Sequence, residues 1–195
     1  METSMKNFTL VLLTCAALVS LVACGGSKKN TSPSPKTIAY TDPAPGTPFR
    51  FVKNASLSTS THLVLDLVSD QATPSNGLAF DVSLINASGV VAWAKVASSD
   101  ATYVRNGAVF DLGSAPNGIA ATVSSAQLKA VVGQKGIASP KNLNLGVLAS
   151  VALDAGSNTG SATFSIGKFQ MIPGSRTITT VPTSSVSFGT VTVTG

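Results

Sequence analysis

The chain has 195 residues, of which 44% are hydrophobic and only 11% are charged. This composition supplies enough apolar surface for a sizeable buried core and argues against a disordered chain. The formal net charge is +5, but the Lys and Arg residues are scattered and form no basic stripe with interleaved aromatic residues, so we predict no nucleic-acid partner.

The amino terminus has the pattern of a bacterial lipoprotein signal. The apolar run Phe8–Val22 is too short for a membrane-spanning helix, which needs about 20 apolar residues. It ends in Leu21-Val22-Ala23-Cys24, which resembles the lipobox, where the chain is cut just before a lipid-modified cysteine. We therefore expect a signal peptide over residues 1–23 and a lipid on Cys24 that holds the protein at a membrane. An ordinary signal peptide with a chance cysteine is the alternative.

The residue after Cys24 is a glycine rather than the aspartate that resembles an inner-membrane retention signal. We therefore expect a lipid anchor in the outer membrane, on either its periplasmic face or the cell surface. Residues 24–48 are rich in Ser, Pro, Gly, Asn and Lys, a composition that predicts a flexible tether. We expect the folded domain to span residues 49–195, and its stability to come from its core, since it contains no cysteine.

Short apolar runs between turn residues predict an all-β domain. In the run Leu143–Leu153, alternate residues are apolar, which is typical of an extended strand, and we expect a central strand with a break or bulge at Gly146. The other predicted strands are Phe49–Val52, Leu63–Val68, Leu78–Leu84, Val90–Val96, Tyr103–Leu112 (in two pieces around a hairpin turn at Asn106-Gly107), Ile119–Val123, Ala162–Phe169 and Val186–Val193.

One segment favours a helix. Ser125–Val132 is preceded by Ser124, which could cap a helix, and is followed by Gly133, which could end one. Turns recur elsewhere at the spacing typical of β-sandwiches. The sequence therefore predicts an all-β fold, a jelly-roll β-sandwich of about nine strands with one short helix at most.

The sequence gives little indication of a catalytic site. His62 is the one histidine, and Asp66, the nearest carboxylate on the same strand face, would lie about 13 Å away along an extended chain. That distance is too long for a hydrogen bond, although a partner from another strand stays open. Most aspartates stand beside turns or strand ends, where they cap backbone groups or are solvated. We predict that the protein is not an enzyme.

A calcium site is the one metal site worth considering. Asp154, Asn158 and the backbone carbonyls of Asp154–Gly160 could ligate a hard cation. However, no EF-hand spacing is present, and the same residues are typical of a plain Asn/Gly turn. We predict no cofactor and no metal site.

Two aromatic residues are candidate binding groups. Sugar-binding modules present flat aromatic rings, and Trp93 and Tyr103 lie one loop apart. Strict alternation places Trp93 on the same face as Val91 and Lys95, whereas a kinked strand would turn it into the core. An exposed platform and a core residue both stay open for Trp93.

Three motifs resemble the cohesin domain family, the β-sandwich receptors of cellulosomes, and related sandwiches similar to carbohydrate-binding modules. They are the pair Gly77–Leu84 (GLAFDVSL) and Val90–Val96 (VVAWAKV), the strand Gly146–Leu153 (GVLASVAL), and the closing strand Phe188–Val193 (FGTVTV). The resemblance covers the chain from about Phe49 to Gly195. One departure is Asn86-Ala87-Ser88, which stands where cohesins usually carry a Tyr-Asp-Pro turn.

The resemblance implies recognition of a dockerin-like protein module, or of a polysaccharide, through an exposed sheet face. Asp81 is the polar contact position that matches, and Ser83 shares its outward side. With Trp93 and Tyr103, these are our candidate binding residues. We therefore expect a non-enzymatic surface lipoprotein that recognises a partner; a structural component of an envelope or appendage assembly is the alternative.

Overall fold

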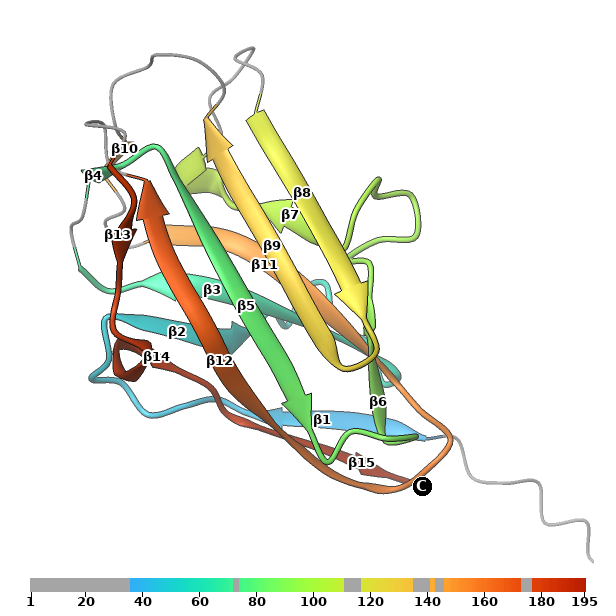
Figure 1. Ribbon diagram of the computed structural model, residues 1–195. Helices are drawn as coiled ribbons and strands as arrows, with labels where there is room; N and C mark the ends of the chain where they lie inside the picture. The colour runs from blue at the N-terminus through green and yellow to red at the C-terminus, as the bar shows by residue number, and fades with distance from the viewer. Residues whose placement is uncertain (1–35, 72–73, 111–116, 135–140, 143–145, 173–176) are drawn as a thin grey trace, which may run out of the picture. The chain divides into compact units, whose positions relative to one another are not determined.

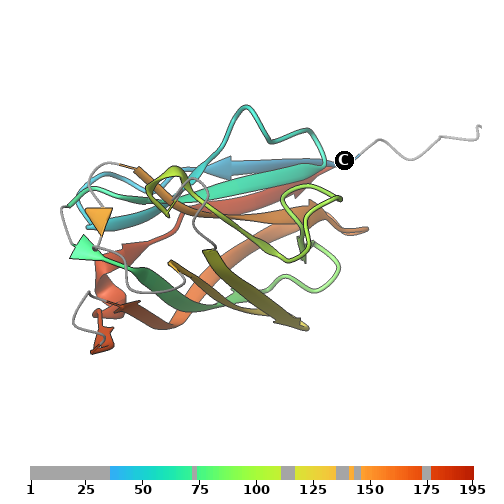
Figure 2. The ribbon, with the colours of Figure 1, turned by 90° about the horizontal axis from the view of Figure 1, so that it is seen from above.

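The computed structural model describes residues 36–71, 74–110, 117–134, 141–142, 146–172 and 177–195. They form two facing β-sheets (Figures 1 and 2). The helical turns in this part of the chain are two short 3-10 segments, η1 (Ala108–Phe110) and η2 (Thr183–Ser185). The predicted all-β sandwich is therefore confirmed.

The first sheet contains, from edge to edge, β1 (Thr37–Thr41), β15 (Thr190–Thr194), β12 (Gly160–Ile172), β5 (Gly77–Ile85), β9 (Gln127–Gln134) and β8 (Asn117–Ser124), with β13 (Thr179–Thr180) paired to β12. The second contains β14 (Val186–Ser187), β2 (Phe49–Lys53), β3 (His62–Ser69), β11 (Gly146–Ala155) and β6 (Val91–Ala94), with β7 (Val104–Asn106) also beside β11. A separate short pair joins β4 (Pro74–Ser75) to β10 (Lys141–Asn142).

Strand β11 lies inside the second sheet, as predicted. It pairs with β3 on one side and with both β6 and β7 on the other. Its register shifts between Val147 and Ala149, so the irregularity falls at Leu148 rather than at Gly146. Leu148 is fully buried, which indicates that core packing fixes the position of the bulge. Residues 143–145 of the predicted strand lie outside the described residues.

The core forms because alternate side chains of both sheets point between the layers. In β3, Leu63, Leu65 and Leu67 are fully buried. Phe51 of β2 stacks on Phe188 with ring centroids 4.7 Å apart and meets the edge of Phe80 at 6.0 Å. Aromatic rings from both sheets therefore fill the space between them, and burial of this kind stabilises a domain that contains no disulfide.

The predicted helix at Ser125–Val132 is wrong. Ser125, with a left-handed φ of 54°, and Ala126 form a tight turn, and the segment from Gln127 onward lies in β9, hydrogen-bonded to β8 and β5. Leu128 and Val132 are fully buried, while Lys129 is exposed, which is the alternation of a strand. Helix propensity is a weak local preference, and pairing on both sides of β9 overrides it.

The predicted hairpin at Asn106-Gly107 is also not found. Strand β7 ends at Asn106 and continues into η1. Gly107 donates its backbone N–H to Leu148 O at 3.0 Å, and a Cβ on this glycine would lie 1.9 Å from Val147 O. The glycine is needed for close approach to β11 rather than for a hairpin turn. Residues 111–112 lie outside the described residues.

Strand β1 lies inside the segment predicted as a tether. All five of its residues pair with β15, and Ile38 is only 3% exposed. Tyr40, two residues further, donates its hydroxyl to Phe51 O at 2.8 Å. The start of the folded domain therefore differs from the expected boundary at Phe49, because a short apolar alternation stands within a segment whose composition is otherwise that of a linker.

The predicted signal peptide and Cys24 lie outside the described residues and stay predictions. In the part of the chain that is described, we find no helix with the length and apolar character needed to span a membrane.

The outer face of the second sheet is covered at its centre by the domain's own loops. Val64 and Ala152 point away from the main core, yet both are fully buried in a separate cluster with Val96, which belongs to the β6–β7 connection. Asp66 on the same face accepts hydrogen bonds from Asn54 Nδ2 at 2.8 Å and Ser150 Oγ at 2.6 Å. The covering loops and satisfied polar groups close the centre of this face to a partner, while one hollow remains near each end of β3, the first beside His62 and the second beside Val68.

Candidate interaction face

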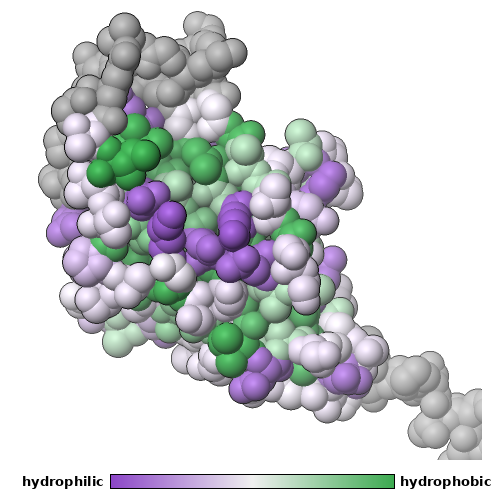
Figure 3. All heavy atoms as spheres, in the orientation of Figure 1, coloured by the Kyte–Doolittle hydropathy of each residue, from purple (hydrophilic) through white to green (hydrophobic). Residues whose placement is uncertain are grey.

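The outer side of the first sheet is open where β8, β9, β5 and β12 lie side by side (Figure 1). We call this surface the open face. Its outward side chains stand in rows because the four strands pair in register. In the order β8, β9, β5 and β12, the first row is Ser124, Gln127, Ser83 and Ser165, the second is Thr122, Lys129, Asp81 and Lys168, and the third is Ala120, Val131, Ala79 and Gln170. Figure 3 shows hydrophilic side chains grouped across the middle of this surface, bordered by more hydrophobic ones.

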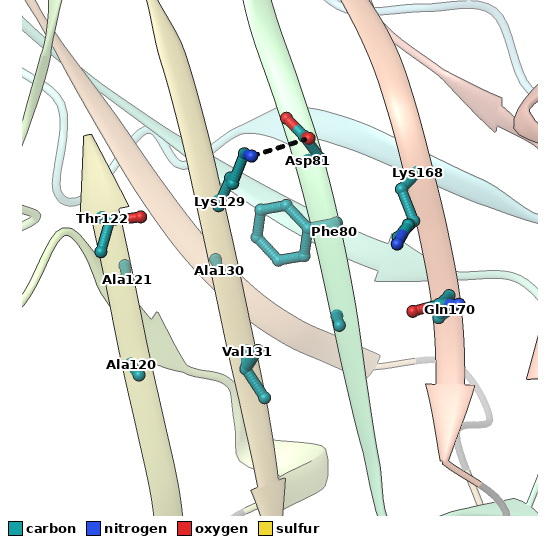
Figure 4. A pocket seen from close by; sticks show the side chains of 11 residues that line it. Phe80, Asp81, Ala120, Ala121, Thr122, Lys129, Ala130, Val131, Lys168 and Gln170 are labelled. Carbon is teal, nitrogen blue, oxygen red and sulfur yellow. Dashed lines mark ion pairs between the residues drawn. The ribbon is translucent and has the colours of Figure 1, made fainter. Parts of the chain in front are cut away.

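A shallow hollow of about 370 Å³ lies at the centre of the open face (Figure 4). Its charged members, Lys129, Asp81 and Lys168, come from three neighbouring strands and belong to one row. Its more apolar side is formed by Ala79, Ala120 and Val131 of the next row. Because the alanine side chains are short, the backbone beneath them lies close to the surface, and a partner could approach the sheet closely.

Asp81 is incompletely satisfied in this hollow. Its side chain is 21% exposed, and Oδ2 lies 4.0 Å from Lys129 Nζ. Oδ1 is buried and accepts no hydrogen bond from the described residues. A buried polar atom without a partner costs about 1–3 kcal/mol, but a partner at the surface cannot reach Oδ1. Oδ2 belongs to the exposed part of the carboxylate and accepts no hydrogen bond from the described residues, so it is the oxygen that a donor of a bound partner can reach.

Lys168 reaches the open face through a bulge in β12. The register with β5 shifts between Ile166 and Lys168, so Gly167 is the extra residue opposite Asp81. Lys168 is exposed, and no carboxylate among the described residues pairs with it. Bulges often re-aim a side chain at a binding surface, and this one leaves an unpaired cation beside a carboxylate that has a free oxygen.

The structure brings together two of the four predicted binding residues on the open face. Asp81 and Ser83 are two residues apart on β5 and both point outward, where each is half-buried. The two lysines beside Asp81 were missed by sequence reasoning. Lys129 lay in the predicted helix, and the neighbourhood of Lys168 depends on strand pairing and on a bulge that no local pattern reveals.

Trp93 and Tyr103 do not lie on the open face. Trp93 is only 8% exposed, belongs to the main core and donates Nε1–H to Ala126 O at 2.8 Å. Of the two alternatives for this residue, the structure therefore supports the core position. Tyr103 is half-buried against the same core. Both line a second hollow, of about 420 Å³, together with His62 and Asp154.

His62 finds its carboxylate on a neighbouring strand rather than its own. Its Nδ1 lies 2.6 Å from Asp154 Oδ1, and its Nε2 lies 3.1 Å from Val96 O. With both ring nitrogens engaged, the imidazole faces a carbonyl where a serine or threonine nucleophile would be needed. The pair could not be found from sequence spacing, since 92 positions separate its members.

The segment considered for calcium forms a turn against another loop. Gly156 donates its backbone N–H to Val90 O at 2.7 Å, and Asn158 donates its own to Gly89 O at 2.8 Å. Asp154 is paired with His62. Across the described residues, no group of three or more His, Cys, Asp or Glu side chains is placed to hold a metal ion.

No family model and no curated protein matches this sequence. Solved structures do match its fold. A type II cohesin domain from the cellulosome of Acetivibrio cellulolyticus has a TM-score of 0.53 at 11% identity and covers 75% of this chain and 95% of that chain. A chain of a type II cohesin–X–dockerin complex from the same organism has a TM-score of 0.55 at 8% identity, covering 73% and 94%.

A third match is the second type II cohesin module of an adaptor scaffoldin from Acetivibrio cellulolyticus, with a TM-score of 0.51 at 8% identity, covering 69% of this chain and 84% of that chain. The class is thus a mainly antiparallel β-sandwich whose first sheet has an open outer face. More particularly, the chain has the cohesin fold, as the sequence motifs predicted. Identities this low establish the fold alone.

Proposed function

We propose that this protein is a non-enzymatic recognition module that binds a dockerin-like protein through the open face. One observation carries the proposal: the domain's own loops cover the centre of one outer sheet face, whereas the open face holds, in a central hollow, a half-buried carboxylate whose Oδ2 has no hydrogen-bond donor among the described residues. The match to a chain from a cohesin–X–dockerin complex supports a protein partner.

The open face has the physical features of a protein interface. Alanine side chains line part of the central hollow and let a partner approach the sheet closely, and a standard interface needs about 800 Å² from each side. Asp81 and Lys168 offer one acceptor and one donor within a single row. Charged groups that become desolvated at the centre of an interface contribute strongly to specificity when the partner pairs with them.

Site-specific photocrosslinking in the native envelope tests this proposal. A photoreactive amino acid replaces Ala120, which is exposed on the open face, or Thr59, which is exposed in a loop outside it and serves as the control. We expect the Ala120 variant to give a protein adduct of defined mass that the Thr59 variant does not give. Adducts from both positions, or from neither, would contradict binding through the open face; a glycan adduct would show that the partner class is wrong.

We also propose that a lipid on Cys24 anchors the protein in the outer membrane. The sequence motif at Leu21–Cys24 supports this anchor. The wild-type protein should enter the detergent-rich phase of Triton X-114 and cofractionate with outer-membrane proteins, and the Cys24→Ser variant should lose both properties. A wild-type protein that stays in the aqueous phase would refute the anchor.

A further inference from the structure

The second hollow lies on the second sheet, away from the open face. His62 of β3, Trp93 of β6 and Asp154 of β11 contribute to its walls, and Lys95, Ser98 and Tyr103 come from the β6–β7 connection. Its volume of about 420 Å³ falls within the range of small-molecule sites, about 300–1,000 Å³. It therefore offers space for a ligand that is independent of any partner on the open face.

The position of the Asp154 carboxylate is fixed by its neighbours. Strand pairing sets Asp154 directly opposite His62, and Asp154 Oδ1 accepts a hydrogen bond from the imidazole at 2.6 Å. The same imidazole lies 3.1 Å from Val96 O, which ties the β6–β7 connection to the sheet. Oδ2 of Asp154 stays available as an acceptor, and the loop that carries the other groups is held in place.

The remaining polar groups of the hollow are free. Within the part of the chain that the structure describes, the side chains of Lys95, Ser98 and Tyr103 form no hydrogen bond or ion pair with another protein group. The hollow thus combines a carboxylate acceptor, an ammonium donor and two hydroxyls that can act as both. Lys95 and Asp154 carry opposite charges, which disfavours a strongly anionic or cationic ligand.

We propose that the second hollow binds one sugar ring of a neutral glycan. A pyranose carries several hydroxyls that both donate and accept hydrogen bonds, which suits this set of groups, and it has apolar C–H faces that pack on an aromatic wall such as Tyr103. Trp93 is too deeply buried to act as the stacking platform. The ligand is small, so we expect a dissociation constant of about the millimolar order.

Trp93 makes the proposal directly testable because it is the one tryptophan in the chain and lines the hollow. The full-length protein, in a zwitterionic detergent without sugar headgroups, is titrated with maltose, cellobiose, lactose, xylobiose and chitobiose while its tryptophan emission is recorded. We expect a saturable change with at least one disaccharide. Asp81→Asn, on the open face, should leave that change intact.

Three variants decide whether the signal comes from this hollow. Tyr103→Ala removes the aromatic wall and should weaken binding about tenfold. Tyr103→Phe and Ser98→Ala each remove one hydroxyl with little risk to the fold and should weaken binding about threefold or more. The proposal is overturned if no disaccharide gives a saturable change, or if Tyr103→Phe and Ser98→Ala both bind as the wild type does. Crosslinking from Ala120 would be unaffected in either case, so its outcome is separate.

Discussion

Tyr40 joins elements that local sequence patterns do not connect. Its hydroxyl donates to Phe51 O of β2 at 2.8 Å and accepts the backbone N–H of Gly189 at 2.6 Å. Gly189 stands between β14 and β15, which belong to different sheets. The substitution Tyr40→Phe keeps the ring and removes both hydrogen bonds, so it isolates the contribution of this junction to stability.

The expected loss follows from the two backbone groups left without a partner. Each costs about 1–3 kcal/mol when buried, and because Tyr40 is half-buried we take the lower part of that range, about 2–4 kcal/mol in total. For a domain of this size the midpoint of thermal unfolding should fall by about 5–15 °C. Circular dichroism during thermal and urea unfolding measures both quantities.

Tyr103→Phe is the matched control, since the structure shows no protein hydrogen bond to the Tyr103 hydroxyl among the described residues. It should change the free energy of unfolding by less than about 0.5 kcal/mol. Burial also raises the pKa of Tyr40. The unfolded tyrosine ionises near pH 10, so the stability tied to the neutral ring is present below that pH and is lost as the pH rises above it. Equal effects of the two substitutions would refute the role given to Tyr40.

Three further variants test other parts of the structure. Arg50 donates hydrogen bonds to Asp70 at 2.8 and 3.2 Å and thereby lowers the pKa of that carboxyl. Arg50→Met should therefore lower the free energy of unfolding by at most about 1 kcal/mol near neutral pH. Urea titrations should show this difference shrinking as the pH falls below about 4. Asp81→Ala should leave the free energy of unfolding unchanged or raise it by about 1 kcal/mol, since its Oδ1 lacks a donor, while abolishing the open-face crosslink; a large loss of stability would show that Asp81 is structural. Gly107→Ala should destabilise the domain by about 3 kcal/mol or more, because its Cβ would lie 1.9 Å from Val147 O; unchanged urea unfolding would contradict that packing.

Parts of the candidate sites were visible in the sequence. Asp81 and Ser83 could be placed on an outward strand face because alternation along β5 is regular. Trp93 could not be assigned from alternation alone, since its burial depends on packing against Phe164, with ring centroids 6.3 Å apart, from a strand far along the chain. The sequence therefore indicated candidate binding residues, and the fold placed them on two separate surfaces, the open face and the second hollow.

Composition and period-two alternation by themselves determined that this chain is an all-β sandwich with a self-sufficient core, and the resemblance of three strand motifs indicated the cohesin fold. Those signals are local, since they depend on which side of one strand a residue faces. Only the tertiary structure decided which strands become neighbours. It thereby decided that most of Ser125–Val132 forms a strand rather than a helix, and that β1 belongs to the domain rather than to the tether. The lysine–aspartate row and the His62–Asp154 pair were decided there as well. The physical reason is that pairing and packing between distant segments outweigh the small conformational preferences of each segment alone.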